Sequence, residues 1–92
     1  MVYFYTIEKD EKVGAEWMLV SARHGNPVAQ NRVARLYATG RVFEVNPAEA
    51  MKWHILAKAG GRSDAWLDDF VARLPSAAQK EGEARARDFK PG

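Results

Sequence analysis

The residues of this chain that could do chemistry are few and scattered. His24 and His54 are its only imidazoles and cysteine is absent, so no transition-metal ligand spacing is present. Asp64, Asp68 and Asp69 lie close enough in sequence to suggest a hard-cation site, but one helix supplies no encircling loop of oxygen atoms. No phosphate-binding glycine loop, nucleophile motif or paired acid and base occurs. The sequence therefore predicts a non-catalytic protein with no cofactor and no metal.

The composition is that of one small domain of mixed charge. The 92 residues are 47% apolar, and 14 basic against 12 acidic side chains leave a net charge of only +2. That excess is too small for a strong nucleic-acid patch, although basic helix surfaces leave a nucleic-acid-associated factor as the alternative function. No run approaches the roughly 20 apolar residues of a membrane span. The first residues lack the basic start of a signal peptide, so a cytoplasmic location is the default expectation.

The elements that position these residues come from an internal repeat. Trp17 is followed by a small residue four positions later, Gly eight later and Ala twelve later, and Trp53 is followed in the same way. The offset is 53 − 17 = 36 residues, and the helix-capping residues Asp10 and Asn46 share it. A period of this length predicts stacked helical units. We expect both tryptophans to pack between helices, a ligand-binding aromatic cage being the alternative.

Capping signals place five helices. Asp10 opens the first, over 11–24; Asn26-Pro27 and Asn46-Pro47 open the second and third, which end at glycines 40 and 60. Ser63-Asp64 caps the fourth, which Pro75 stops, and a capping box at 76–79 opens the fifth. Residues 2–7 alternate aromatic and β-branched side chains, which predicts an extended segment over the first helix or, alternatively, a paired strand. The expected organisation is an extended segment at 1–9, tandem repeats at 10–75, and a capping helix and tail at 76–92.

The repeat resembles the Sel-one-like repeat family of bacteria and eukaryotes, relatives of the tetratricopeptide repeats. The matching positions are Ala29, Gln30, Val33, Tyr37, Gly40, Val42, Asn46, Ala50, Trp53, Ala57 and Gly61. The resemblance covers about residues 10–66, and it implies an all-α, right-handed solenoid of antiparallel helix pairs. It also implies a scaffold or adaptor that binds another protein or peptide. Ala34 and Lys58 depart from the family pattern, which has Gly and Ala there.

The first unit looks incomplete, because the chain begins with what resembles the second helix of a pair. Either the chain is a piece of a longer array, or residues 1–7 substitute for the missing helix. Val13, Leu19 and Val20 would then present an apolar patch, which residues 1–7 cover or where two chains self-associate.

The resemblance also implies where a partner would bind. In the tetratricopeptide unit the first helix of each pair lines the concave side, which here means the second and fourth helices. With Tyr37 and Phe70 turned into the core, Asn31, Arg35 and Asp68 are expected to contact a partner, with Arg35 as the anchor. The alternative is that Arg35 and Asp68 pair only with each other.

Overall fold

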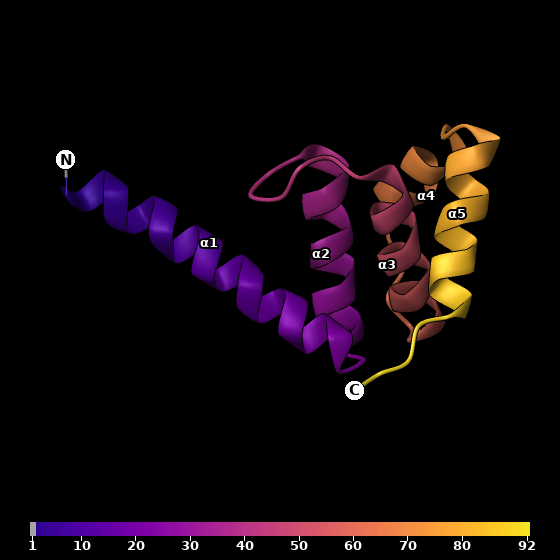
Figure 1. The fold of residues 1–92 in the computed structure, drawn as a ribbon, viewed down its shortest axis with the longest axis horizontal. Helices are drawn as coiled ribbons and strands as arrows, with labels where there is room; N and C mark the ends of the chain where they lie inside the picture. Colours follow the sequence, from indigo (N-terminus) through magenta and orange to yellow (C-terminus); the bar gives the residue numbers. More distant parts are fainter. Residues whose placement is uncertain (1) are drawn as a thin grey trace.

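The chain folds as five helices with no strand among residues 2–92, the part that the computed structural model describes; side chains are described from Asp10 onward. The helices are α1 (Val2–Arg23), α2 (Pro27–Thr39), α3 (Pro47–Ala59), α4 (Ala65–Ala72) and α5 (Ser76–Arg87) (Figure 1). The predicted all-α class and the number of helices are confirmed.

Three of the helix starts follow from their capping side chains as predicted. Asn26 accepts hydrogen bonds from the backbone N–H groups of Val28 and Ala29, and Asn46 accepts one from Glu49. The Asp64 carboxylate accepts from the N–H of Leu67 at the start of α4. Each cap satisfies donors that have no partner within the helix.

The prediction for the N-terminus is wrong, because α1 begins at Val2 and residues 2–9 are helical rather than extended. No described strand is available to pair with this segment, and a helix satisfies its backbone groups internally. Consequently, the segment cannot fold back over the helix of which it is the first part. The N-terminal half of α1 instead projects away from the other four helices (Figure 1).

The capping box predicted at the start of α5 is also absent. Pro75 occupies the cap position, and no side chain caps the helix. The Gln79 side chain, which would have completed the box, instead donates a 2.8 Å hydrogen bond from Nε2 to the carbonyl of Val71. Gln79 therefore joins α5 to the end of α4 rather than stabilising its own helix terminus.

The helices after α1 pack around α3. α2 and α3 lie side by side and run in opposite directions, and α5 lies against the other side of α3 (Figure 1). The approach of α5 is close, since a Cβ added at Gly82 would lie 2.7 Å from the Cβ of Met51 and 3.1 Å from the carbonyl oxygen of Ala48. α1 packs against α2.

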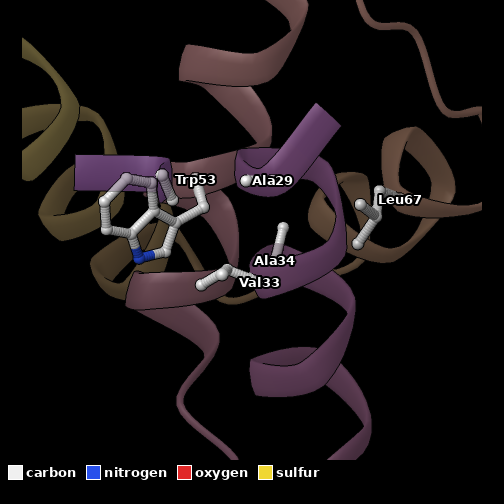
Figure 2. Close-up of a cluster of buried hydrophobic side chains, with 6 residues drawn as sticks. Ala29, Val33, Ala34, Trp53 and Leu67 are labelled. Carbon is white, nitrogen blue, oxygen red and sulfur yellow. The ribbon is translucent and has the colours of Figure 1, made fainter. Parts of the chain in front are cut away.

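The core forms where α2, α3 and α4 meet. Trp53 of α3 is 1% exposed, and the α2 residues Ala29, Val33 and Ala34 lie between it and Leu67 of α4 (Figure 2). The Trp53 ring also meets Phe89 edge to face, with centroids 5.4 Å apart. The predicted packing of Trp53 between helices is confirmed.

The same prediction is wrong for Trp17, whose side chain is 67% exposed. α1 turns its small residues Ala15 and Ala22 inward, and Ala22 joins the core beside Ala29 of α2. Trp17 lies away from Ala15 and Ala22, beside an open hollow that the start of α2 also lines. Trp17 and Trp53 share a position in the 36-residue repeat, but they have different neighbours in the structure.

Candidate interaction surface on α2 and α4

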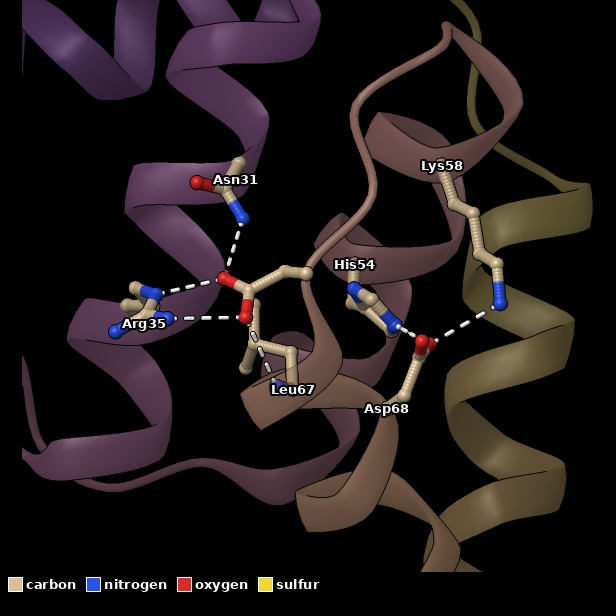
Figure 3. Close-up of polar contacts among 7 residues, drawn as sticks. Asn31, Arg35, His54, Lys58, Leu67 and Asp68 are labelled. Carbon is tan, nitrogen blue, oxygen red and sulfur yellow. Dashed lines mark hydrogen bonds and ion pairs between the residues drawn. The ribbon is translucent and has the colours of Figure 1, made fainter.

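A buried carboxylate joins α2 to the start of α4. Arg35 donates to Asp64 through Nε at 2.6 Å and Nη2 at 2.9 Å, and the side-chain amide of Asn31 donates at 2.8 Å (Figure 3). Asp64 also caps α4 through Leu67, so one side chain fixes the end of one helix against the face of another. Asp64 and Asn31 are buried, while Arg35 is half exposed. We call Asn31, Arg35 and Asp64 the Asp64 cluster.

The electrostatics of the Asp64 cluster favour the charged forms. The Arg35 guanidinium holds the pKa of the Asp64 carboxyl far below its usual range, against the opposing effect of burial, and the hydrogen bonds from Asn31 and Leu67 act in the same direction. In return, Asp64 raises the pKa of Arg35. Both groups are therefore ionised at neutral pH, and the bidentate geometry adds directionality to their attraction.

A stacked aromatic pair adjoins this cluster, with Phe70 partly buried against the core. Trp66 and Phe70 of α4 stack with their centroids 5.8 Å apart, and the Arg35 guanidinium carbon lies 5.1 Å from the centre of the Trp66 ring. Trp66 is nevertheless 46% exposed. Together with Asp69, Arg73 and Leu74, the two rings line a shallow hollow of about 330 Å³. We call Arg35, Trp66 and Phe70 the aromatic shelf.

Asp68 faces away from both groups. Its carboxylate lies 2.7 Å from Nε2 of His54 and accepts a 3.1 Å bond from Nζ of Lys58, both on α3 (Figure 3). These hydrogen bonds lower the pKa of Asp68, His54 contributing most. The predicted alternative of an Arg35–Asp68 pair is therefore wrong: Arg35 pairs with Asp64, and Asp68 with α3. Asp64 is the cap residue before α4 and has an extended backbone, so its side chain does not align with that of Asp68 four residues later. Asp64 therefore reaches α2, and Asp68 reaches α3.

The three neighbouring carboxylates also do not converge on a common point. Asp64 faces Arg35, Asp68 faces α3, and Asp69 pairs with Arg73 along the surface of α4 at 3.1 Å. Across the described residues, no group of three His, Cys, Asp or Glu side chains is placed to hold a metal ion. In the same part of the chain, no helix is both long and apolar enough to cross a bilayer.

Sequence reasoning turned Trp66 and Phe70 into the core and so missed the aromatic shelf: Phe70 does pack against the core, whereas Trp66 is exposed. α4 carries apolar residues at two overlapping helical spacings, one through Trp66 and Phe70 and one through Leu67 and Val71. Only Leu67 is fully buried. The signal that separates the two stripes is Asp64, because a cap tied to α2 fixes the rotation of α4 about its own axis.

No protein-family model, curated protein or solved structure matches this chain. The resemblance to the Sel-one-like repeats thus depends on the residues that carry it.

Proposed function

We propose that this chain is a non-catalytic helical-repeat module that binds another protein or a peptide through the α2–α4 surface. The observation that carries the proposal is Trp66, a large aromatic side chain held half exposed by Phe70 and Arg35. Rigid aromatic residues beside an arginine are the side chains most often found at binding hot spots. The shallow shape of the hollow suits a protein or peptide surface better than a reaction that must exclude water.

A right-handed solenoid of the Sel-one-like type is part of the same proposal. Antiparallel packing of α2 and α3, with α5 on the far side of α3, is the order expected of stacked helix pairs. The spacing supports it too, because Phe89 follows Trp53 by 89 − 53 = 36 residues, the offset that separates Trp53 from Trp17. In that arrangement α2 and α4 are equivalent helices and form one continuous face.

The three residues expected to contact a partner have different roles in this proposal. Arg35 borders the aromatic shelf and contacts the partner directly. Asn31 is buried and acts through Asp64, by holding the start of α4 in place. Asp68 lies on the α3 side and contributes only to partners that extend beyond the shelf.

The proposal is tested by comparing Trp66→Ser with Trp17→Ser. Both change an exposed tryptophan, but only Trp66 belongs to the α2–α4 surface. Protein captured from native lysate by the wild type and by Trp17→Ser, and lost with Trp66→Ser, identifies a partner of this surface. With that partner purified, calorimetry should show binding weakened by about 30-fold or more for Trp66→Ser.

Two results would contradict the proposal. Undiminished binding by a chain carrying both Trp66→Ser and Arg35→Ala would move the site off α2 and α4. Retention on a polyanion column at low salt, with steep loss at moderate salt, would favour nucleic acid instead. Against that alternative, many cations are already paired within the chain, including Arg35, Lys58 and Arg85.

A further inference from the structure

The strongest feature outside the α2–α4 surface is an apolar stripe on the outer face of α1. Val13, Trp17 and Val20 are 44%, 67% and 40% exposed, and their spacings of four and three residues align them along one side of the helix. α2 packs on the opposite side, against Ala15 and Ala22. A stripe of this length and spacing is typical of a helix that pairs with another helix.

The internal repeat shows how this stripe compares with a covered one. Trp53 occupies the same repeat position as Trp17, and it is buried by α2 on one side and by Phe89 on the other. Among the described residues, Trp17 has no such covering helix. An exposed tryptophan flanked by two exposed valines marks an interaction site rather than a scattered surface residue.

The polar residues at the two ends of the stripe fit a second copy of the same chain. Asp10 lies seven residues before Trp17 and His24 lies seven residues after it, and both are exposed. Nδ1 of His24 donates a 2.8 Å hydrogen bond to the carbonyl of Val20, so Nε2 can donate to a carboxylate only when the ring is protonated. Two α1 helices related by a two-fold axis at Trp17 run antiparallel, and each Asp10 then lies beside the His24 of the other copy. A parallel pair would instead place Asp10 beside Asp10.

The shapes along the stripe fit the same arrangement. Gly14 and Val20 lie three residues on either side of Trp17, so the two-fold axis places a residue without a side chain opposite a branched one. Val13 and Ser21, four residues on either side, give a second pairing of large with small. A Cβ added at Gly14 would meet no atom within 4 Å, so the backbone there is open to close approach.

A hollow beside Trp17 gives the two indole rings a place to lie. It has a volume of about 390 Å³, and Gly14, Met18, Val28 and Ala29 are among the residues that line it, between α1 and the start of α2. Because the two-fold axis passes near Trp17, each ring can turn into the hollow of the other copy. The knob and the hole are therefore on the same surface, as a two-fold interface requires.

We propose that the outer face of α1 is a self-association surface, on which two copies pair antiparallel through Val13, Trp17 and Val20. The contact is essentially one helix pair, so the dimer belongs to the small, weak class of interfaces, with a dissociation constant on the order of micromolar. It leaves the α2–α4 surface free in both copies. The proposal is thus independent of the proposed binding function.

The first test is sedimentation velocity of the purified chain from about 1 μM to about 300 μM, a range that spans the expected dissociation constant. The wild type should pass from monomer to dimer. Trp17→Gln should raise the dimer dissociation constant by about 30-fold or more, as loss of a central aromatic anchor does. Trp66→Gln is the matched control and should dimerise like the wild type. A wild type that stays monomeric throughout, or a Trp17→Gln chain that dimerises normally, would overturn the proposal.

The second test measures orientation and keeps Trp17 intact. The chain has no cysteine, so engineered thiols report only on themselves. In the antiparallel pair, Val13→Cys of one copy lies opposite Ser21→Cys of the other, and a mixture of the two variants should form a disulfide on mild oxidation. Val13→Cys alone should not, since the two thiols would be displaced by about 12 Å along the helices. Cross-linking of Val13→Cys alone as readily as in the mixture would exclude the antiparallel pair.

Discussion

Replacement of Asp64 by alanine should be the most informative single change near the α2–α4 surface. The side chain caps α4 through Leu67 and accepts charged hydrogen bonds from Arg35, and loss of a cap typically costs about 1 kcal/mol. The ion pair adds about 1 kcal/mol, because half of the Arg35 side chain is in water and regains hydration when the pair is lost. The buried amide of Asn31 would lose its acceptor, which costs about 1 kcal/mol or more.

These three contributions predict that Asp64→Ala lowers the free energy of unfolding by about 3 kcal/mol. Urea unfolding followed by circular dichroism should show the midpoint falling by about 1–3 M with an unchanged slope. Asp64→Asn should lose less, because asparagine is an equally good cap and keeps one hydrogen-bonding oxygen. Asp69→Ala is the matched control: Asp69 pairs only with Arg73, both side chains are exposed, and the loss should be below about 0.5 kcal/mol.

The comparison between Asp64→Ala and Asp69→Ala decides whether the cluster forms. Equal midpoints for the two variants would mean that Asp64 is solvated like Asp69, and that the ties to Arg35 and Asn31 are absent in solution. In that case the start of α4 would have no polar tie to α2, and the exposure of Trp66 would need another explanation. A double-mutant cycle between Asp64→Ala and Arg35→Ala isolates the pair itself and should give a coupling of about 1 kcal/mol.

Three further predictions test the burial of Trp53, the packing at two glycines and the charge of the Asp64 cluster. Trp53→Ala should cost about 3–5 kcal/mol and leave the chain largely unfolded, and a thermal melt within a few degrees of the wild type would contradict the buried position of Trp53. Gly82→Ala should lower the free energy of unfolding by about 1 kcal/mol despite the better helix propensity of alanine, because the added Cβ would collide with α3. Gly14→Ala has open space around the added Cβ and should raise the free energy of unfolding by about 0.5–1 kcal/mol. Urea titration at low protein concentration measures both changes. Because folding lowers the pKa of Asp64, the charged carboxylate stabilises the fold fully at pH values above the usual carboxyl pKa of about 4. This stabilisation is lost progressively as the pH falls toward the pKa in the folded state. Stability measured from pH 5 down to about 2 should therefore fall less steeply for Asp64→Asn than for the wild type.

The sequence is sufficient to predict the helices where capping is local. Asn26, Asn46 and Asp64 are each followed within three residues by the N–H groups they accept from, so no distant contact is needed to place α2, α3 and α4. The start of α1 could not be predicted in this way. Residues 2–7 favour extended structure intrinsically, but no described strand is available to pair with them, and they are helical.

The candidate surface could be predicted only in part, because it depends on how one helix is rotated against another. Asn31, Arg35 and Asp68 were all expected at one face, and two of them do meet at Asp64. The position of Asp68 depends on the rotation of α4, which its sequence leaves open because two apolar stripes compete. The tie between Arg35 and Asp64 spans 29 residues, and no local pattern signals it.

The two repeat tryptophans also show what the sequence pattern does not determine. Trp17 and Trp53 have equivalent sequence surroundings, yet their exposed fractions are 67% and 1%. Burial is a property of the neighbours, and a repeat pattern specifies the surface a helix offers but not whether a partner covers it. For Trp53 the partners are α2 and Phe89, just after α5, of the same chain. Burial of Trp17 would also be favourable, since an exposed indole between two valines keeps a large apolar area in water. Because this apolar surface is exposed, a binding partner should be sought on the outer face of α1 as well as on the α2–α4 surface.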